Sequence, residues 1–156
     1  MKKFTCVADI GDLTTAVAEA MEIKRDRFQF TGLGRNKTLL MLFFNSSLRT
    51  RLSTQKAAEP LLEAIPVMGS YCDVIGVRSF ARFHDKAEDY EERVLEQFIR
   101  YSGRPVFSME AATRHPLQSF ADLITIEEYK TTERPKVVMT WAPHPNALPQ
   151  AVPNSF

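Results

Sequence analysis

Short apolar runs alternate with helical patterns along most of this chain, and no other feature constrains its fold as strongly. Residues 37–44 hold a continuous apolar run that is too short for a buried helix and is followed by polar residues, as is typical of a central parallel strand. Residues 48–58 contain good helix formers without Gly or Pro, and Ser46 or Ser47 can cap their amino end. A strand, a loop and a helix are therefore expected in that order.

The same order recurs along the rest of the chain. Asp12 is the expected N-cap of a first helix, and Pro116 fits the first turn of the last helix. Strands that alternate with helices pair in parallel, so we predict an α/β fold with a three-layer parallel sheet and a ligand at the carboxyl ends of the strands. Helices are predicted at 12–23, 90–101 and 115–123, and strands at 73–77, 105–109 and 136–141.

Composition narrows the function classes. The chain has 156 residues, 44% of them hydrophobic, which suits one compact domain with a real core. Twenty Lys and Arg against nineteen Asp and Glu leave a net charge of +1, so nucleic acid is not an expected partner. No apolar run is long enough to span a bilayer, and Met1 is not followed by the apolar core of a signal peptide. We expect a cytoplasmic protein that does not bind membranes.

The sequence offers no pattern for metal or nucleophilic chemistry. Cys6 and Cys72 lie far apart without a CxxC spacing, which predicts free buried thiols. No group of His, Cys and carboxylate residues has metal-ligand spacing, and no Ser or Cys has a recognisable base nearby. We therefore expect neither a metal nor a cofactor.

The stretch from Arg27 to Ala58 carries six basic residues and no Asp or Glu. Within it, residues 46–51 (SSLRTR) lie where a strand ends and a helix begins, so backbone N–H groups, hydroxyls and guanidinium groups converge. This pattern favours a phosphate or carboxylate site, with a solvent-exposed basic helix face as the alternative. It is not a Walker loop, because no G-x-x-x-x-G-K-[ST] is present.

Polar residues also follow the later strands. Arg78 comes directly after the strand at 73–77, where a surface arginine paired with a carboxylate is the alternative interpretation. His115 and Gln118 lie about one turn apart at the start of a helix and form a donor pair that can polarise a carbonyl, although His-Pro is equally a loop constraint. Glu110 and Arg114 belong to the same cluster, and a histidine at position 144 follows the last strand.

Three segments, in this order, resemble the signatures of the transcarbamylase family, whose members pass a carbamoyl group from carbamoyl phosphate to an amine. Residues 44–51 (FNSSLRTR) resemble its phosphate signature, usually S-T-R-T-R, with Leu48 in place of a threonine. Residues 73–80 (DVIGVRSF) are similar to the strand and arginine that reach the carbamoyl oxygen. Residues 115–125 (HPLQSFADLIT) look like the H-P-x-Q-x-x-A-D segment. The resemblance covers nearly all of the chain.

This resemblance implies roles for particular residues. Arg78, His115 and Thr50 would stabilise the oxyanion, and Gln118 would orient the carbamoyl NH₂ group. Residues expected to hold carbamoyl phosphate are Ser47, Leu48, Arg49, Thr50, Arg78, His115 and Gln118. Pro116 and Leu117 are also expected to bind substrate.

Within the family, the chain resembles the N-acylornithine branch. Leu48 and residues 109–114 and 141–145 carry this resemblance, which implies that Glu110 and His144 contact an acylated ornithine. The implied reaction yields N-acylcitrulline and phosphate in arginine biosynthesis, in a homotrimer whose sites are shared between subunits. Ornithine carbamoyltransferase, or a non-catalytic phosphate-binding or assembly domain, are the alternatives. Whether the acyl group is succinyl or acetyl stays open.

Two departures from the family pattern bear on the domains. Family members carry roughly thirty more residues after Ala58, among them a second parallel strand that the sheet would need. The tail from Pro135 holds five of the nine prolines and has no expected packed element. We therefore predict a carbamoyl phosphate-binding domain over 1–134 that lacks a strand and a loop after Ala58. Residues 135–156 would be the first strand and start of a shortened second α/β domain, which binds the amino acid.

Overall fold

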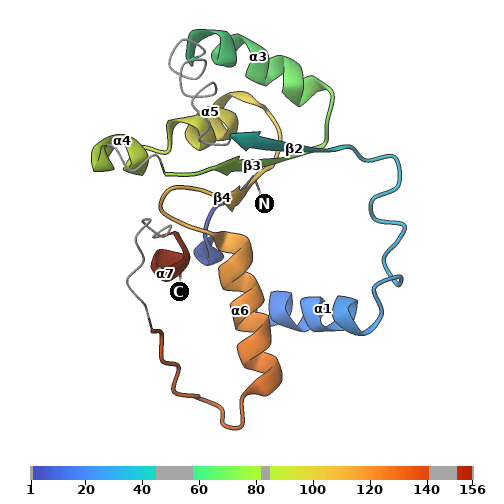
Figure 1. Cartoon of the computed structure of the whole chain (residues 1–156). Coiled ribbons are helices and arrows are strands. Elements are labelled where there is room, and N and C mark those ends of the chain that lie inside the picture. The colour runs from blue at the N-terminus through green and yellow to red at the C-terminus, as the bar shows by residue number, and fades with distance from the viewer. Residues whose placement is uncertain (1, 45–57, 82–84, 141–150, 156) are drawn as a thin grey trace.

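The structure of the chain is a computed structural model, which describes residues 2–44, 58–81, 85–140 and 151–155. Its centre is a parallel four-stranded sheet with the strand order β1-β4-β3-β2 (Figure 1). The strands are β1 (Lys3–Phe4), β2 (Leu39–Phe44), β3 (Val74–Ser79) and β4 (Val106–Glu110). The predicted α/β fold with a parallel sheet is confirmed.

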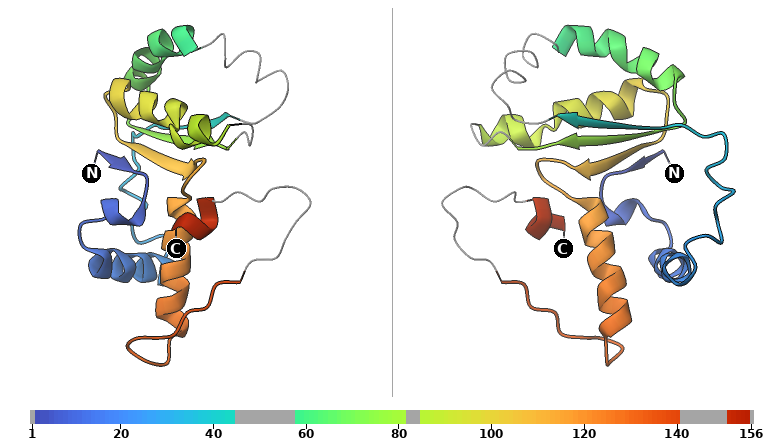
Figure 2. Two further views of the ribbon diagram at one scale, coloured as in Figure 1. Left: turned by 90° about the vertical axis from the view of Figure 1, so that its left-hand side faces the viewer. Right: turned by 45° about the vertical axis from the view of Figure 1, so that its right-hand side comes forward.

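Helices lie on both sides of this sheet. Figure 2 shows α3 and α5 over one side, with α6 and α1 on the other, which gives the three expected layers. The N-cap prediction for α1 is confirmed, because the carboxylate of Asp12 accepts the backbone N–H of Thr15 at 3.1 Å. The described helices are η1 (Val7–Asp9), α1 (Leu13–Arg25), α3 (Ala58–Ser70), α4 (Lys86–Tyr90), α5 (Arg93–Tyr101), α6 (Pro116–Tyr129) and α7 (Ala151–Ser155).

The hydrophobic core lies between the sheet and the layer formed by α3 and α5. Alternate residues of β2 face this core, and the ring of Phe44 packs 6.1 Å from that of Phe98. Each large side chain buried there contributes roughly 1.5–3 kcal/mol relative to exposure. The fully buried apolar side chains of this cluster are Ile65, Ile75, Val77, Leu95, Phe98 and Val106.

The prediction of a central strand at 37–44 is wrong for the described residues, in which β2 lies at the edge of the sheet. A run that is apolar on both faces predicts burial on both faces. In the structure, Leu40 and Leu42 pack on the core, whereas Met41 and Phe43 on the outer face stay 52% and 55% exposed. Most of the helix predicted at 48–58 lies outside the described residues.

The predicted last strand, 136–141, is also wrong over its described part. Residues 136–140 form no strand, and Val138 is 70% exposed. A strand is stable only when its backbone groups pair with a neighbour, and no described strand lies beside this segment. The apolar character of the run was therefore a poor guide to its conformation in this chain.

The two ends of the chain carry elements that the sequence patterns did not predict. β1 pairs with β4 through only two residues, which is too short for a periodicity to show. The tail has a packed element after all, because α7 contacts α6 and buries Ala151 completely. No helix in the described ranges combines the length and apolar character that crossing a membrane requires. Both cysteines are free thiols, with Cys72 buried and Cys6 half-buried.

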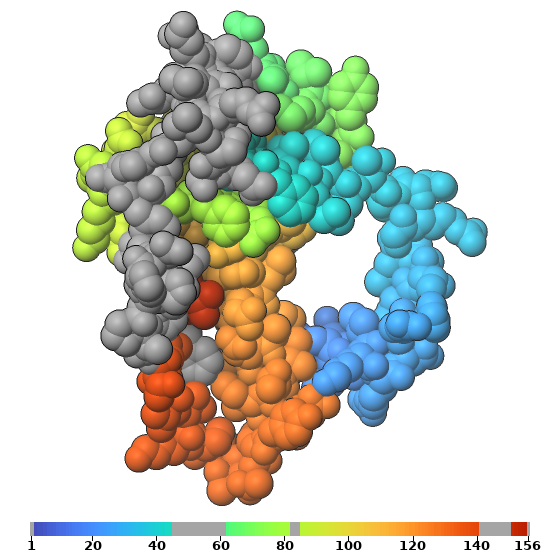
Figure 3. Space-filling model, in the orientation of Figure 1, coloured from blue at the N-terminus to red at the C-terminus, as the bar shows by residue number. Residues whose placement is uncertain are grey.

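The connection between α1 and β2 stands apart from the rest of the molecule. Figure 3 shows it as a light blue arm separated from α6 by an opening. Its side chains are exposed, including Phe28 at 66% and Leu33 at 76%. The arm enters the sheet where Lys37 and the backbone N–H of Thr38 contact the carboxylate of Asp73. Those contacts, the Thr38 backbone N–H first, lower the pKa of Asp73.

Gly69 provides a test of how α3 packs. A Cβ at this position would lie 2.1 Å from the carbonyl oxygen of Ser102, at the end of α5. We expect Gly69→Ala to lower the free energy of unfolding by about 1–3 kcal/mol, because the two backbones must move apart. Gly32→Ala is the control, since its Cβ would meet no atom within 4 Å. Equal urea midpoints for the two variants would contradict this packing.

Candidate functional site

A β-bulge shapes the carboxyl end of the sheet. Val77 on β3 lies opposite Ser108 on β4, but the next residue, Arg78, lies opposite Glu110. The register therefore shifts between Val77 and Arg78, which places two charged residues side by side on neighbouring strands. Bulges of this kind re-aim side chains and are common next to active sites.

Arg78 and Glu110 form an ion pair at this bulge. The Nη2 and Nε atoms of Arg78 lie 3.0 Å and 3.3 Å from the same oxygen, Oε2 of Glu110. The Glu110 side chain is 7% exposed and that of Arg78 38%. The guanidinium also lies over the ring of Phe80, 4.4 Å from its centroid. Arg78 thus pairs with a carboxylate, as its alternative interpretation predicts. This pair lies at the carboxyl edge of the sheet, where the ligand is expected.

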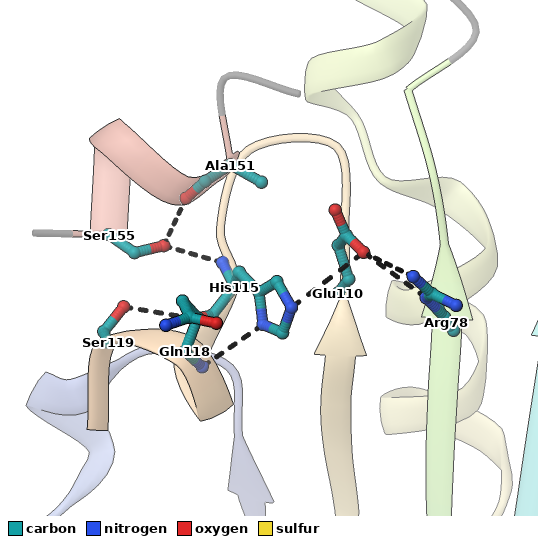
Figure 4. Close-up of polar contacts among 7 residues, drawn as sticks. All are labelled: Arg78, Glu110, His115, Gln118, Ser119, Ala151 and Ser155. Atoms are coloured by element: carbon teal, nitrogen blue, oxygen red, sulfur yellow. Dashed lines mark hydrogen bonds and ion pairs between the residues drawn. The ribbon is translucent and has the colours of Figure 1, made fainter. Parts of the chain in front are cut away.

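His115 lies beside this pair (Figure 4). It is the N-cap of α6, and its Nδ1 atom accepts the backbone N–H of Gln118 at 3.3 Å. A neutral imidazole whose Nδ1 accepts carries its proton on Nε2. The Nε2 atom lies 3.9 Å from Oε2 of Glu110, which is longer than a hydrogen bond. The helix terminus therefore selects the tautomer whose N–H points toward the ion pair.

The other predicted residues of α6 have different surroundings. The side-chain amide of Gln118 donates to Asp122 at 2.8 Å, one turn further along the helix, so its bond to His115 is made by the backbone. Pro116 is buried at the first helical position, and Leu117 is 40% exposed. Of the two predicted donors, His115 therefore offers a ring N–H, whereas the side-chain amide of Gln118 already donates to a residue of its own helix.

Several predicted residues lie outside the described part of the chain. Ser47, Leu48, Arg49 and Thr50 fall within 45–57, and His144 falls within 141–150. The structure therefore brings together Arg78, Glu110 and His115, and it leaves the sequence-based expectations for the others untested.

Three of the six basic residues of the acid-free stretch do not join this cluster. Arg27 and Arg35 lie on the exposed arm, and Lys37 pairs with Asp73 at 3.3 Å. Both Lys37 and Asp73 precede their strands, so they lie at the amino ends of β2 and β3. The ion pair and His115 lie at the opposite, carboxyl ends.

Two serines that the sequence patterns missed hold His115 in place (Figure 4). The backbone N–H of His115 donates to the hydroxyl of Ser155 at 2.6 Å, and that hydroxyl donates to the carbonyl of Ala151. The hydroxyl of Ser119 donates to the carbonyl of His115 at 3.0 Å. The Ser119 contact follows from helical spacing, whereas Ser155 lies 40 residues away and no local pattern could have signalled it.

This arrangement suits recognition of a polar, partly anionic group. A guanidinium and a ring N–H converge near a buried carboxylate, at the edge of a parallel sheet where ligands of α/β proteins bind. Such donors stabilise negative charge that develops on a carbonyl oxygen. Within the described ranges, no group of three or more His, Cys, Asp and Glu residues could hold a metal ion.

Comparison with known proteins points to one family. Residues 54–128 match the family described as aspartate/ornithine carbamoyltransferase, carbamoyl-P binding domain. The chain is 68% identical to an N-succinylornithine carbamoyltransferase of Bacteroides thetaiotaomicron, over all of this chain and 59% of the relative. It is 32% identical to an N-acetylornithine carbamoyltransferase of Xanthomonas axonopodis, over 92% of this chain and 53% of the relative.

Solved structures agree with the sequence relatives. The crystal structure of an acetylornithine transcarbamylase complexed with acetylcitrulline matches with a TM-score of 0.81 and 30% sequence identity, over 99% of this chain and 57% of that one. The chain thus spans between 53% and 59% of the length of these three relatives. The stretch matched in the Bacteroides protein is 188 residues long against 156 here, a difference of 32 residues that have no counterpart in this chain.

The ion pair can be tested by removing its cation. We expect Arg78→Met to lower the free energy of unfolding by about 1–3 kcal/mol, because the buried carboxylate of Glu110 loses its charged hydrogen-bond donors. The double variant Arg78→Met/Glu110→Gln should recover part of this loss, since no buried charge then remains. Urea unfolding of the parent, both single variants and the double variant gives the coupling free energy. Strictly additive losses would show that the two residues do not interact.

Proposed function

Because this chain belongs to the aspartate/ornithine carbamoyltransferase family, we propose that it is the carbamoyl phosphate-binding part of an N-acylornithine carbamoyltransferase. The reaction would move the carbamoyl group to the δ-amine of an N-acylated ornithine, giving N-acylcitrulline and phosphate. Identity of 68% to an N-succinylornithine enzyme, against 32% to an N-acetylornithine enzyme, favours the succinyl substrate. The observation that carries the proposal is the convergence of Arg78 and His115 at the carboxyl edge of the sheet.

The proposed chemistry is a transfer in which positioning and charge stabilisation supply the rate. The lone pair of the deprotonated δ-amine forms a bond to the carbonyl carbon, and the bond from that carbon to the phosphate oxygen breaks. The proton that the nitrogen then loses leaves with the departing phosphate. Negative charge gathers on the carbonyl oxygen in between. The Nε2–H of His115, which is too far from Glu110 to bond it, and the guanidinium of Arg78 are the described donors for that charge. Each aligned donor supplies about 2.7–4 kcal/mol.

The remaining roles come from the family resemblance and stay predictions. Thr50 would be a third donor to the oxyanion, and Gln118 would turn its amide from Asp122 to orient the carbamoyl NH₂ group. Arg49 and the backbone near Ser47 would hold the phosphate. Glu110 and His144 would contact the acylated ornithine. Cytoplasmic location, a role in arginine biosynthesis and a homotrimer with shared sites also remain predictions.

The domain boundaries are likewise proposed. The 32 residues of the Bacteroides relative without a counterpart support a segment missing from this chain, which we propose lies after Ala58. Residues 136–140, which form no helix or strand, support the view that a second domain begins near 135. The proposed carbamoyl phosphate-binding domain therefore covers 1–134.

A second candidate function is a non-catalytic phosphate-binding or assembly domain. The observation that favours it is the family match over 54–128, which is to a domain described as binding carbamoyl-P. Both candidates bind phosphate, and only the enzyme forms a citrulline-type product. Formation of that product therefore separates them.

The phosphate site can be tested with Arg49→Ala. We expect this variant to bind carbamoyl phosphate or inorganic phosphate about 10–100-fold more weakly, since a hydrogen bond to a charged group contributes 1.5–3 kcal/mol. Isothermal titration calorimetry measures the change. Arg35→Ala is the matched control, because Arg35 lies in the same acid-free stretch but on the exposed arm. Equal weakening by both substitutions would mean a diffuse charge effect instead of a site.

Activity should depend on the parts of the relatives that this chain lacks. We expect no measurable product from the present chain, because effective molarity is lost when the part holding the amine is absent. A chain extended with the relative's segment after Ala58 and its second domain should turn over and prefer N-succinylornithine to N-acetylornithine, free ornithine or aspartate. Colorimetric measurement of the ureido product compares the four amines. Turnover of the present chain near that of the extended one would refute this.

A further inference from the structure

The segment 111–114 joins the two halves of the candidate site. It connects Glu110, at the end of β4, to His115, at the start of α6. Ala111 and Ala112 are buried, and the N–H of Ala111 donates to the carbonyl of Arg114 at 2.9 Å, which closes a turn. The conformation of these four residues therefore sets where the imidazole of His115 lies relative to the carboxylate of Glu110.

Glu92, which precedes α5, has an unusual backbone conformation. Its φ and ψ are 43° and 39°, in the left-handed region. Among the described non-glycine residues, only Glu92 and Asn36 have a positive φ, and Asn tolerates this region far better than Glu. Backbone strain of this kind persists where other contacts hold the residue in place, and it is enriched at functional sites.

The side chain of Glu92 makes those contacts with the segment 111–114. Its Oε1 atom accepts the backbone N–H of Thr113 at 2.7 Å and the Thr113 hydroxyl at 2.7 Å. Both bonds are short, as is typical when the acceptor is charged. The carboxylate makes no capping bond to its own helix, although Glu92 is the N-cap residue of α5. It instead links two elements that are 21 residues apart.

We propose that Glu92 is a positioning residue, which anchors the segment 111–114 so that the Nε2–H of His115 and the ion pair of Arg78 and Glu110 face one substrate carbonyl. The catalytic consequence rests on the proposed function, whereas the anchoring itself does not. The segment is then held at two points, at Thr113 by Glu92 and at His115 by Ser155. Loss of the Glu92 carboxylate should therefore disturb residues 111–115 more than it disturbs the rest of the fold.

Amide hydrogen exchange tests the anchoring independently of any ligand. We expect Glu92→Gln to speed exchange at Ala111, Thr113 and His115 by about tenfold, because each of these N–H groups is hydrogen-bonded only while the segment keeps its conformation. Exchange at Ile75 in β3 should change less than twofold. Thr113→Val, which removes the hydroxyl alone, should give a smaller increase at the same three amides.

Glu91→Gln is the matched control, since this neighbouring glutamate pairs with Arg93 at the surface and should leave the three amides unchanged. The increase in the double variant Glu92→Gln/Thr113→Val should be smaller than the product of the two single increases, because both substitutions act on the bonds between one pair of residues. Unchanged exchange at 111–115 in Glu92→Gln, or an equal increase at Ile75, would overturn the proposal.

Ligand titration then tests the catalytic consequence. In Glu92→Gln, the Kd for inorganic phosphate should change less than twofold, whereas the affinity advantage of carbamoyl phosphate over phosphate should fall about fivefold or more, since only the carbamoyl group reaches His115. A parent chain that binds neither ligand would contradict the proposed function and leave the exchange result valid. Equal weakening of both ligands in Glu92→Gln would overturn the positioning role.

Discussion

The contact between Arg78 and Glu110 sets the geometry at the carboxyl ends of β3 and β4. A carboxylate with only a few per cent of its surface exposed requires a charged partner, because a lone buried charge costs several kcal/mol. Its partner comes from the neighbouring strand, and only the register shift at Val77 and Arg78 brings the two residues opposite each other. The bulge, the ion pair and the position of β4 beside β3 are therefore parts of one arrangement.

Other elements of the fold hold a second hydrogen-bond donor, the ring of His115, beside this pair. α6 begins at His115, and the helix terminus fixes the tautomer of the ring through the Gln118 N–H. α7 reaches the same residue from the far end of the chain through Ser155. The core on the other side of the sheet keeps β3 and β4 in register through Ile75, Val77 and Val106. Hydrogen bonds from α6 and α7 thus converge on His115, while the core holds the strands that carry the ion pair.

The sequence was sufficient to predict the layers of the fold and the parallel sheet. Alternating runs predicted a parallel sheet, Asp12 predicted the start of α1, and Pro116 predicted the start of α6, because each of these signals is local. The family resemblance predicted Arg78, Glu110 and His115 as site residues, and the structure brings these three together, but the resemblance did not predict the pairing between the first two. That pairing depends on a bulge, which leaves no mark in apolar periodicity.

Other features could not be read locally. The position of β2 at an edge depends on which strands are present to pair with it, and the unpaired state of 136–140 has the same cause. Glu92 and Ser155 act on residues 21 and 40 positions away, and the left-handed conformation of Glu92 runs against the preference of its residue type. Tertiary contacts overrode local preference at each of these places.

The central claim, that Arg78 and His115 receive a carbamoyl group at the carboxyl edge of the sheet, can be measured directly by NMR on protein labelled with ¹⁵N-arginine and ¹⁵N-histidine. Saturating carbamoyl phosphate should shift the Nε resonance of Arg78 and the Nε2 resonance of His115, and His115 should keep the Nε2–H tautomer. Inorganic phosphate at saturation should leave both resonances near their unliganded positions. If carbamoyl phosphate binds and neither resonance moves, the carbamoyl group is held elsewhere and the account is wrong.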